Sequence, residues 1–465
     1  MTKHYHSLVF LFLFFSATYA QTTAIPDANF EQALIDLGID TDGTINQSVA
    51  TADISGVTYL NVSSKNIGDL TGIEDFVSLT SLYCFDNQLT SLDVTKNTAL
   101  TFLQCYFNQI TSIDVTKNTA LTFLNFNGNQ LTSIDLSQNT LVTTIGLFGN
   151  QLTSLDISKN TALTYIQCQG NQLTALDVSN NVALSNLVCG GNQLTNLDLN
   201  QNIALAKLNC SGTQLSVLDI SNNTLLTDLT CSDMPLLTSL DLTYNTALNY
   251  LSCSSNLLLT LLDITNNTNL TELWCNSNPL LTTLDLSNNT ALKVFYGPET
   301  PFASLDFSNI PALTVLNCSY NPLLTSLNVK NGNNVSLTSF DARNNFLLKC
   351  IQVDDEIAAN AAEAPYTTWI KDASCIYSED CSSLSLEDEL LSQAVTVYPN
   401  PVHDILTIDS QVPLTKVEIY SVFGQKITEI YSGFKTIPTD NLSSGMYVFK
   451  IYSENGTAIK KLIKN

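Results

Sequence analysis

The stretch from Leu79 to Ala99 reads LTSLYCFDNQLTSLDVTKNTA and is one unit of an internal repeat. The pattern restarts at intervals of 21 or 22 residues, at Leu100, Leu121, Val142, Leu163, Leu184, Leu205, Leu226, Leu248, Leu270, Leu292 and Leu313. Self-similarity at this period is typical of a solenoid, in which each coil buries its apolar side against its neighbours. We therefore expect this region to fold as one stack of coils.

Each unit holds two short alternations of apolar and polar residues. The first, LxxLxCxxN, runs from Leu79 to Asn87, and the second, LxxLDV, runs from Leu89 to Val94. Period-two alternation predicts strands with one buried face, and neither stretch has room for a helix of ten residues. We expect two short strands per coil, stacked on those of the next coil at about 4.8 Å.

These motifs resemble a known repeat family. The first alternation resembles the leucine-rich repeat, LxxLxLxxNxL, and the second, LxxLDVxxN, is similar to the bacterial subclass called IRREKO. The resemblance covers residues 58 to 349, and its atypical first unit, residues 58 to 76, resembles the internalin-like variety. It implies a β-rich leucine-rich-repeat solenoid of short parallel strands with little helix.

Composition limits the function classes. The 465 residues include 42 acidic and 18 basic ones, giving a net charge of −24, and Arg343 is the one arginine. Nucleic acid is not expected as a partner, because phosphate binding needs clustered Lys and Arg. The three histidines all lie outside the repeats, and no nucleophile elbow or phosphate-binding loop is present. We expect no enzyme activity and no cofactor.

The N-terminal residues read as an export signal followed by a cap. Residues 1–20 have Lys3, then an apolar run from Leu8 to Phe15, then small residues up to Ala20, which is typical of a secretory signal peptide. No later apolar run could cross a bilayer, so direct membrane insertion is not expected. Residues 21–57 should form an N-terminal cap that includes a helix over 25–38, with Asp27 at its start.

The repeats give way to a second cap and a linker. Residues 350–381 are expected to form the C-terminal cap, and residues 382–394 read as a linker. Cys350, Cys375 and Cys381 lie outside the repeat columns, and an exported protein meets an oxidising compartment. One disulfide is expected; we favour Cys350 with Cys381, and Cys375 stays open as an alternative partner.

Residues 395–465 have a new periodicity. Strand-like runs at 405–408, 416–422, 446–452 and 459–463, with a hairpin signal at Asn455-Gly456, predict a small β-sandwich. The segments YPNP from Tyr398, LSSGMY from Leu442 and the basic end from Lys460 resemble the C-terminal sorting domain of type IX secretion. The resemblance implies that residues 395–465 bind the type IX machinery. It places the mature protein outside a Gram-negative cell, released or held at the outer surface.

Three polar columns repeat along the coils. The nine repeat cysteines share one inward position and are interpreted as core thiols, with a metal or redox ladder as the alternative. Asparagines from Asn87 onward are expected to bond the backbone of adjacent turns. Eleven aspartates from Asp93 to Asp306 should point outward and bond nearby hydroxyls and amides, with divalent cation binding as the alternative. No metal site is predicted.

Aromatic residues mark the candidate ligand-binding face. They flank the cysteine column on the outward side of the first strand: Tyr83, Phe85, Tyr106, Phe107, Phe148, Trp274, Tyr296 and Tyr320. Clustered exposed aromatics are typical of binding surfaces. The sequence thus predicts a secreted or cell-surface, non-enzymatic adhesion protein that binds an extracellular protein or glycan. The alternatives are a structural or ice-binding solenoid, prompted by its threonine columns, and a cation-binding surface-layer component.

Overall fold

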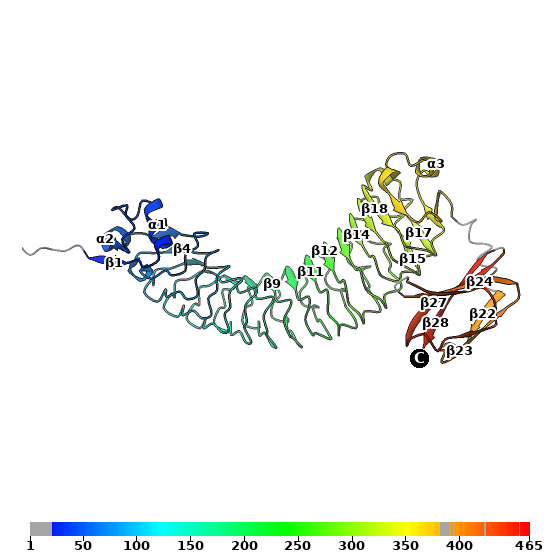
Figure 1. The fold of residues 1–465 in the computed structure, drawn as a ribbon, viewed down its shortest axis with the longest axis horizontal. Coiled ribbons are helices and arrows are strands. Elements are labelled where there is room, and N and C mark those ends of the chain that lie inside the picture. The colour runs from blue at the N-terminus through cyan, green and yellow to red at the C-terminus, as the bar shows by residue number, and fades with distance from the viewer. Residues whose placement is uncertain (1–20, 382–390, 392–393, 423–424, 455) are drawn as a thin grey trace, which may run out of the picture. The chain divides into compact units, whose positions relative to one another are not determined.

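A computed structural model describes residues 21–381, 391, 394–422, 425–454 and 456–465 (Figure 1). The signal peptide predicted for residues 1–20 and most of the linker at 382–394 lie outside the described residues. The chain divides into two compact units, residues 1–139 and 140–465. Each unit is described by itself.

The first unit begins with a cap of two short strands and two helices. Strands β1 and β2 pair antiparallel, and the cap elements are β1 (Thr22–Ala24), α1 (Ala28–Asp36), β2 (Ser48–Ala50) and α2 (Thr51–Ile54). As the sequence predicts, Asp27 is the N-cap of α1: its Oδ1 accepts the amides of Asn29 at 2.8 Å and Phe30 at 3.1 Å. Its Oδ2 accepts the Gly68 amide at 2.7 Å, which ties the helix to the first coil. The Phe30 ring stacks on Phe76, so the cap closes the apolar interior.

The coils of the first unit form a parallel sheet of three-residue strands. The strands are β3 (Tyr59–Asn61), β4 (Ser81–Tyr83), β5 (Phe102–Gln104) and β6 (Phe123–Asn125), with a short 3-10 helix, η1 (Ile73–Asp75), after the first of them. The middle residue of each strand is a buried leucine, and the two flanking residues face outward. This in-register stacking aligns equivalent side chains into columns.

The coils of the second unit continue the same pattern. Its main sheet holds β7 (Thr144–Gly146), β8 (Tyr165–Gln167), β9 (Asn186–Val188), β10 (Lys207–Asn209), β11 (Asp228–Thr230), β12 (Tyr250–Ser252), β13 (Glu272–Trp274), β14 (Val294–Tyr296), β16 (Val315–Asn317), β18 (Ser339–Ala342) and β20 (Ile370–Lys371). A second parallel sheet holds β15 (Ser304–Asp306), β17 (Ser326–Asn328), β19 (Cys350–Gln352) and β21 (Ile376–Ser378). Short helices η2 (Asn334–Ser336), α3 (Glu356–Asn360) and η3 (Tyr366–Thr368) lie near its end.

The prediction of two strands per coil is wrong for the regular coils. Leu89, Leu92 and Val94 are buried as expected, but their stretch forms no strand. The Gln109 amide donates to the Leu89 carbonyl at 2.8 Å, and one bond of this kind per coil does not make a ladder. Within the described residues, second strands occur where β15, β17, β19 and β21 pair, and an isolated parallel bridge joins Leu240 to Leu262.

Residues 395–465 form two antiparallel sheets around their own core, as the sequence predicts. One sheet holds β22 (Val395–Tyr398), β23 (Ile405–Ser410) and β26 (Thr436–Pro438), and the other holds β24 (Leu414–Ser421), β25 (Lys426–Ile430), β27 (Gly445–Ser453) and β28 (Thr457–Lys464). Val395 and Leu406 of the first sheet pack in one cluster with Val417 and Phe449 of the second. Strands β27 and β28 pair as a hairpin, although Asn455 of its turn lies outside the described residues.

Candidate functional site

The asparagine columns hold the turns of neighbouring coils together. Asn87 Oδ1 accepts the amides of Lys65 and Ile67 in the preceding coil, both at 3.0 Å, and its Nδ2 donates to the Val62 carbonyl at 2.9 Å. A second column starts at Asn97, whose Nδ2 donates to the Ile73 carbonyl at 2.7 Å. Each amide thus satisfies backbone groups that the turns leave unpaired. These asparagines therefore have a structural role in the coils.

The cysteine column lies in the core. Nine cysteines have no measurable exposure and free thiols: Cys84, Cys105, Cys168, Cys189, Cys210, Cys231, Cys253, Cys275 and Cys318. Burial raises the pKa of Cys168, Cys210 and Cys253 to about 12. A protonated, enclosed thiol is neither a nucleophile nor a metal ligand. The column therefore serves packing, as interpreted from the sequence.

The aspartate column is exposed, and its carboxylates bond to their own turns. Asp93 Oδ1 accepts the Thr95 hydroxyl at 2.7 Å and the Thr95 amide at 2.9 Å. The same pair of bonds joins Asp263 to Thr265. Bonds from the hydroxyl and amide two residues on lower the pKa of eight of these aspartates: Asp93, Asp114, Asp156, Asp177, Asp219, Asp241, Asp263 and Asp285. This bonding matches the prediction for the column.

An aromatic surface covers the outward side of the sheet in the first unit. We call it the N-terminal aromatic patch; its members are Tyr59, Tyr83, Phe85, Phe102, Tyr106, Phe107 and Phe123. One run of ring contacts passes from Tyr59 to Tyr83, Phe102 and Phe123, with successive centroids 5.2, 5.0 and 4.3 Å apart. A second run has Phe85 stacked on Tyr106 at 4.4 Å, with the Phe107 ring edge-on to Tyr106 at 5.3 Å. The structure thus brings the four predicted N-terminal aromatics into ring contacts along the coils.

Phe107 occupies an unusual backbone position. It sits in the turn after β5 with φ of 54°, the left-handed region that bulky residues rarely adopt. The next coil has Gly128 there, and a Cβ added to Gly128 would lie 2.5 Å from the Phe107 ring. The ring therefore lies over the Gly128 backbone, and 56% of Phe107 is exposed. The equivalent turn position also has a positive φ in other coils, for example at Asp86, Asp233 and Ser255, so the backbone conformation belongs to the repeat and the exposed ring is what distinguishes Phe107.

Three patch members were missed by the sequence analysis. Tyr59, Phe102 and Phe123 extend the patch, and Phe102 and Phe123 stand one residue before the inward leucine of their strands. The prediction considered only residues beside the cysteine column. The signal was present, because in a strand both neighbours of an inward residue face outward.

The predicted aromatics of the second unit are more dispersed. Trp274 of β13 and Tyr296 of β14 are cross-strand neighbours whose ring centroids lie 4.7 Å apart. Phe148 follows β7 and leans toward Gly170, whereas Tyr320 follows β16 with φ of 56° and 45% exposure. Trp274 and Tyr296 form a pair; Phe148 and Tyr320 belong to distant coils.

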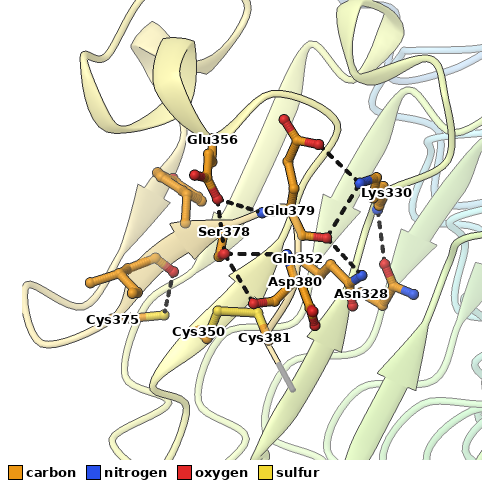
Figure 2. Close-up of a disulfide and its surroundings, with 12 residues drawn as sticks. Asn328, Lys330, Cys350, Gln352, Glu356, Cys375, Ser378, Glu379, Asp380 and Cys381 are labelled. Atoms are coloured by element: carbon orange, nitrogen blue, oxygen red, sulfur yellow. Dashed lines mark hydrogen bonds and ion pairs between the residues drawn. A yellow bond between two sulfur atoms is a disulfide. The ribbon is translucent and has the colours of Figure 1, made fainter. Parts of the chain in front are cut away.

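The C-terminal cap contains the disulfide shown in Figure 2, which joins Cys350 to Cys381 with the sulfurs 2.04 Å apart. Cys375 is buried with a free thiol. Beside the disulfide, Glu356 Oε2 accepts the Ser378 hydroxyl and the Glu379 amide, both at 2.9 Å (Figure 2). Lys330 pairs with Glu379 at 3.1 Å. These contacts anchor the last described residues of the cap to the coils.

The side chains of the outward face determine which interactions it can make. Among the residues that the structure describes, no group of three or more His, Cys, Asp or Glu side chains is placed to hold a metal ion. In the same residues no helix has the length and apolar character needed to cross a membrane. Aromatic rings, amides and hydroxyls line the face, and such groups provide packing and hydrogen bonds.

Comparisons with known proteins agree with this architecture. Residues 396–465 match the model of the family described as the secretion system C-terminal sorting domain. The fold is similar to the functional domain of InlJ from Listeria monocytogenes, which includes a cysteine ladder, with a TM-score of 0.63 and 26% identity over 96% of this chain and 99% of that chain. No curated protein matches the sequence.

Two further solved structures share the fold. An internalin, InlF, from Listeria monocytogenes has a TM-score of 0.57 and 19% identity over 77% of this chain and 98% of that chain. YopM, a leucine-rich effector protein from Yersinia pestis, has a TM-score of 0.53 and 19% identity over 76% and 93% of the two chains. The chain has the solenoid fold of these leucine-rich-repeat proteins. It carries a type IX sorting domain at its C-terminus, which indicates secretion or display at the cell surface.

Proposed function

We propose that this chain is a non-enzymatic binding protein, released from or displayed on a Gram-negative cell, that adheres to an extracellular protein or glycan. The N-terminal aromatic patch is the observation that carries the proposal. Apolar rings on the outward face of a sheet contribute little to the core, so their concentration favours a partner-binding role. The sorting domain brings this face into contact with the cell's surroundings.

The electrostatic setting of the patch adds to the proposal. Residues 21–139 contain 13 acidic side chains and three lysines, so the first unit has a net charge of −10. A field of one sign speeds the approach of partners with the opposite charge. We therefore expect the patch to prefer a partner whose surface joins apolar groups with Lys and Arg.

The test separates stability from binding. Tyr83→Ala, Tyr106→Ala and the double variant should lower the melting temperature only slightly, because the rings contact mainly each other, with a cost of about 1 kcal/mol each. Binding of the full chain to arrays of extracellular proteins and glycans should instead weaken about thirtyfold for at least one of them, as for a central aromatic contact.

Tyr244→Ala is the matched control, since Tyr244 is 59% exposed and lies outside the patch. Its binding should equal that of the unchanged chain. Lost stability with unaltered binding in the Tyr83 and Tyr106 variants would assign the rings to packing and overturn the proposal.

A further inference from the structure

A second surface lies on the outward face of four consecutive coils in the second unit. A cavity of about 260 Å³ opens over strands β9 to β12, which follow one another along the sheet (Figure 1). Its lining is Asn186 and Val188 of β9, Lys207, Leu208 and Asn209 of β10, Asp228 and Thr230 of β11, and Tyr250 of β12. None of these residues belongs to the aromatic sites described above.

The charged groups of the cavity neutralise each other. Lys207 Nζ lies 3.3 Å from Asp228 Oδ1, and the Thr227 hydroxyl donates to Asp228 Oδ2 at 2.6 Å. About half of the Lys207 side chain remains exposed, so its ammonium keeps donor capacity. The pair thus offers both donors and acceptors to a ligand while adding no net charge.

The amides and hydroxyls beside the ion pair have free capacity. Asn209 Oδ1 accepts the Ser211 amide at 3.1 Å, which fixes the side chain and leaves its Nδ2 without a partner among the described residues. The Asn186 amide and the Thr230 hydroxyl also make no side-chain hydrogen bond within the described chain. The cavity therefore presents several half-buried polar groups, of which Asn209 is held by a hydrogen bond to the backbone.

The lining of the cavity also includes an aromatic and an apolar side chain. Tyr250 of β12 lies at one end of the four strands and Val188 of β9 at the other. The adjacent column on the same face contains only small residues, Gly190, Ser211, Ser232 and Ser254. A Cβ on Gly190 would lie 2.6 Å from the Ser211 carbonyl oxygen, so the backbone of the next coil leaves no room for a side chain at this position.

We propose that the cavity over β9 to β12 binds a neutral pyranose unit of an extracellular saccharide. Vicinal hydroxyls both donate and accept, which matches the paired Lys207 and Asp228 and the amides of Asn186 and Asn209. The C–H face of the sugar ring packs on Tyr250. The net charge of −24 disfavours acidic sugars, because like charges repel. This inference rests on the proposed binding function and assigns one ligand class to a second surface, in the second unit.

The experiment titrates the full chain with methyl glucoside, methyl mannoside and methyl galactoside, and follows ligand saturation-transfer NMR. At least one glycoside should bind with a Kd of about 1 mM, as expected for a ligand of this size. Tyr250→Ala and Thr230→Val should each weaken binding about tenfold. Thr230→Val keeps the side-chain shape, so it tests the site even where Tyr250→Ala fails to fold.

Matched controls and outcomes separate the two proposals. Tyr244→Ala removes an exposed tyrosine elsewhere and should leave binding unchanged. Glucuronic acid should bind more weakly than the neutral glycosides. Three results would each overturn the saccharide site: no saturable binding of any glycoside, binding unaffected by both cavity variants, or peptides competing at the cavity. If the arrays still show a partner that depends on Tyr83 and Tyr106, the proposed function stands; if the arrays also show none, both proposals fall.

Discussion

At the scale of single residues, the buried asparagines hydrogen-bond backbone groups of neighbouring coils. A second ladder of paired strands would otherwise satisfy such groups. Asn192 Nδ2 donates to the carbonyls of Cys168 and Cys189 at 3.0 and 2.9 Å, and its Oδ1 accepts the Leu173 amide at 3.0 Å. All three backbone groups lie in the solenoid interior. Each would otherwise be an unpaired polar group away from water, which costs about 1–3 kcal/mol.

Asn192→Ala should therefore lower the free energy of unfolding by about 3 kcal/mol, less than the full sum because the turn can relax. Urea unfolding followed by circular dichroism measures this. Gln193→Ala is the control, since Gln193 is the exposed neighbour and its replacement should cost under about 0.5 kcal/mol. Equal, small effects of the two substitutions would show that water replaces the amide without loss.

The residue types found at a repeat position also decide whether its inward or outward orientation can be predicted from the sequence. The cysteine column alternates with Phe126 and Leu147, so its apolar, inward role is evident from composition alone. The contact between the Phe107 ring and the Gly128 backbone was not evident from the sequence. A contact between coils of this kind depends on turn geometry, which residue types at fixed spacing do not specify.

At the scale of an element, the hydrogen bonds within the turns make the stability of the fold depend on the ionisation of the aspartate column. The bonds from neighbouring hydroxyls and amides lower the pKa of eight carboxylates. A group whose pKa is lower in the folded state stabilises the fold above its unfolded pKa of about 3.9. That stabilisation is lost as the pH falls through the folded pKa.

The melting temperature should therefore be independent of pH near neutrality and should decrease when the pH is lowered below about 4. Scanning calorimetry from neutral to acidic pH measures it. A variant with Asp114→Asn, Asp156→Asn and Asp177→Asn keeps the side-chain acceptor without the charge, so its acid decline should be shallower. A melting temperature that rises on acidification would mean that repulsion within the column outweighs the bonds.

The cysteine column makes a separate prediction about reactivity. All nine repeat thiols are buried, so iodoacetamide at about pH 8 should leave them unlabelled in the native state and label them in urea. Mass spectrometry of the two samples gives the count. Cys375, which is 2% exposed, should be protected with them. Rapid native labelling of Cys168 or Cys189 would contradict the interior position of the column.

The repeat pattern predicted the first strand of each coil correctly, but it did not predict whether the second apolar stretch pairs with that of the next coil. Alternation around Leu82 and Leu103 predicts strands β4 and β5, and the Asp27 cap predicts the start of α1. The same alternation around Leu92 predicts a strand that the structure lacks, because burial on one face is common to strands and to extended turns. Only hydrogen bonding between coils separates these two cases, and periodicity does not report it.

At the scale of the whole molecule, residues 395–465 have an apolar core of their own. Their two sheets enclose their own apolar cluster, from Val395 to Leu462. Within them, Glu418 would have a raised pKa from burial, but bonds from Tyr452, Lys416 and Tyr420 lower its pKa to about 2. A domain with its own core is expected to fold as a unit. Val448 of β27 also packs against Leu323 and Leu347 of the coils, so removing the domain uncovers these two leucines rather than the inward columns of the regular coils.

Deleting residues 395–465 should therefore stop secretion while the coils stay folded. The sorting domain indicates type IX export, so the truncated chain should accumulate in the periplasm, and immunoblots of culture medium, surface and periplasm measure its distribution. Protease resistance and the native shielding of Cys168 should match those of the full chain. The control is Glu454→Ala, a substitution within the domain that should leave secretion normal. Normal secretion of the truncated chain would refute the sorting role, whereas periplasmic retention with labelled Cys168 would show instead that the coils need the domain in order to fold.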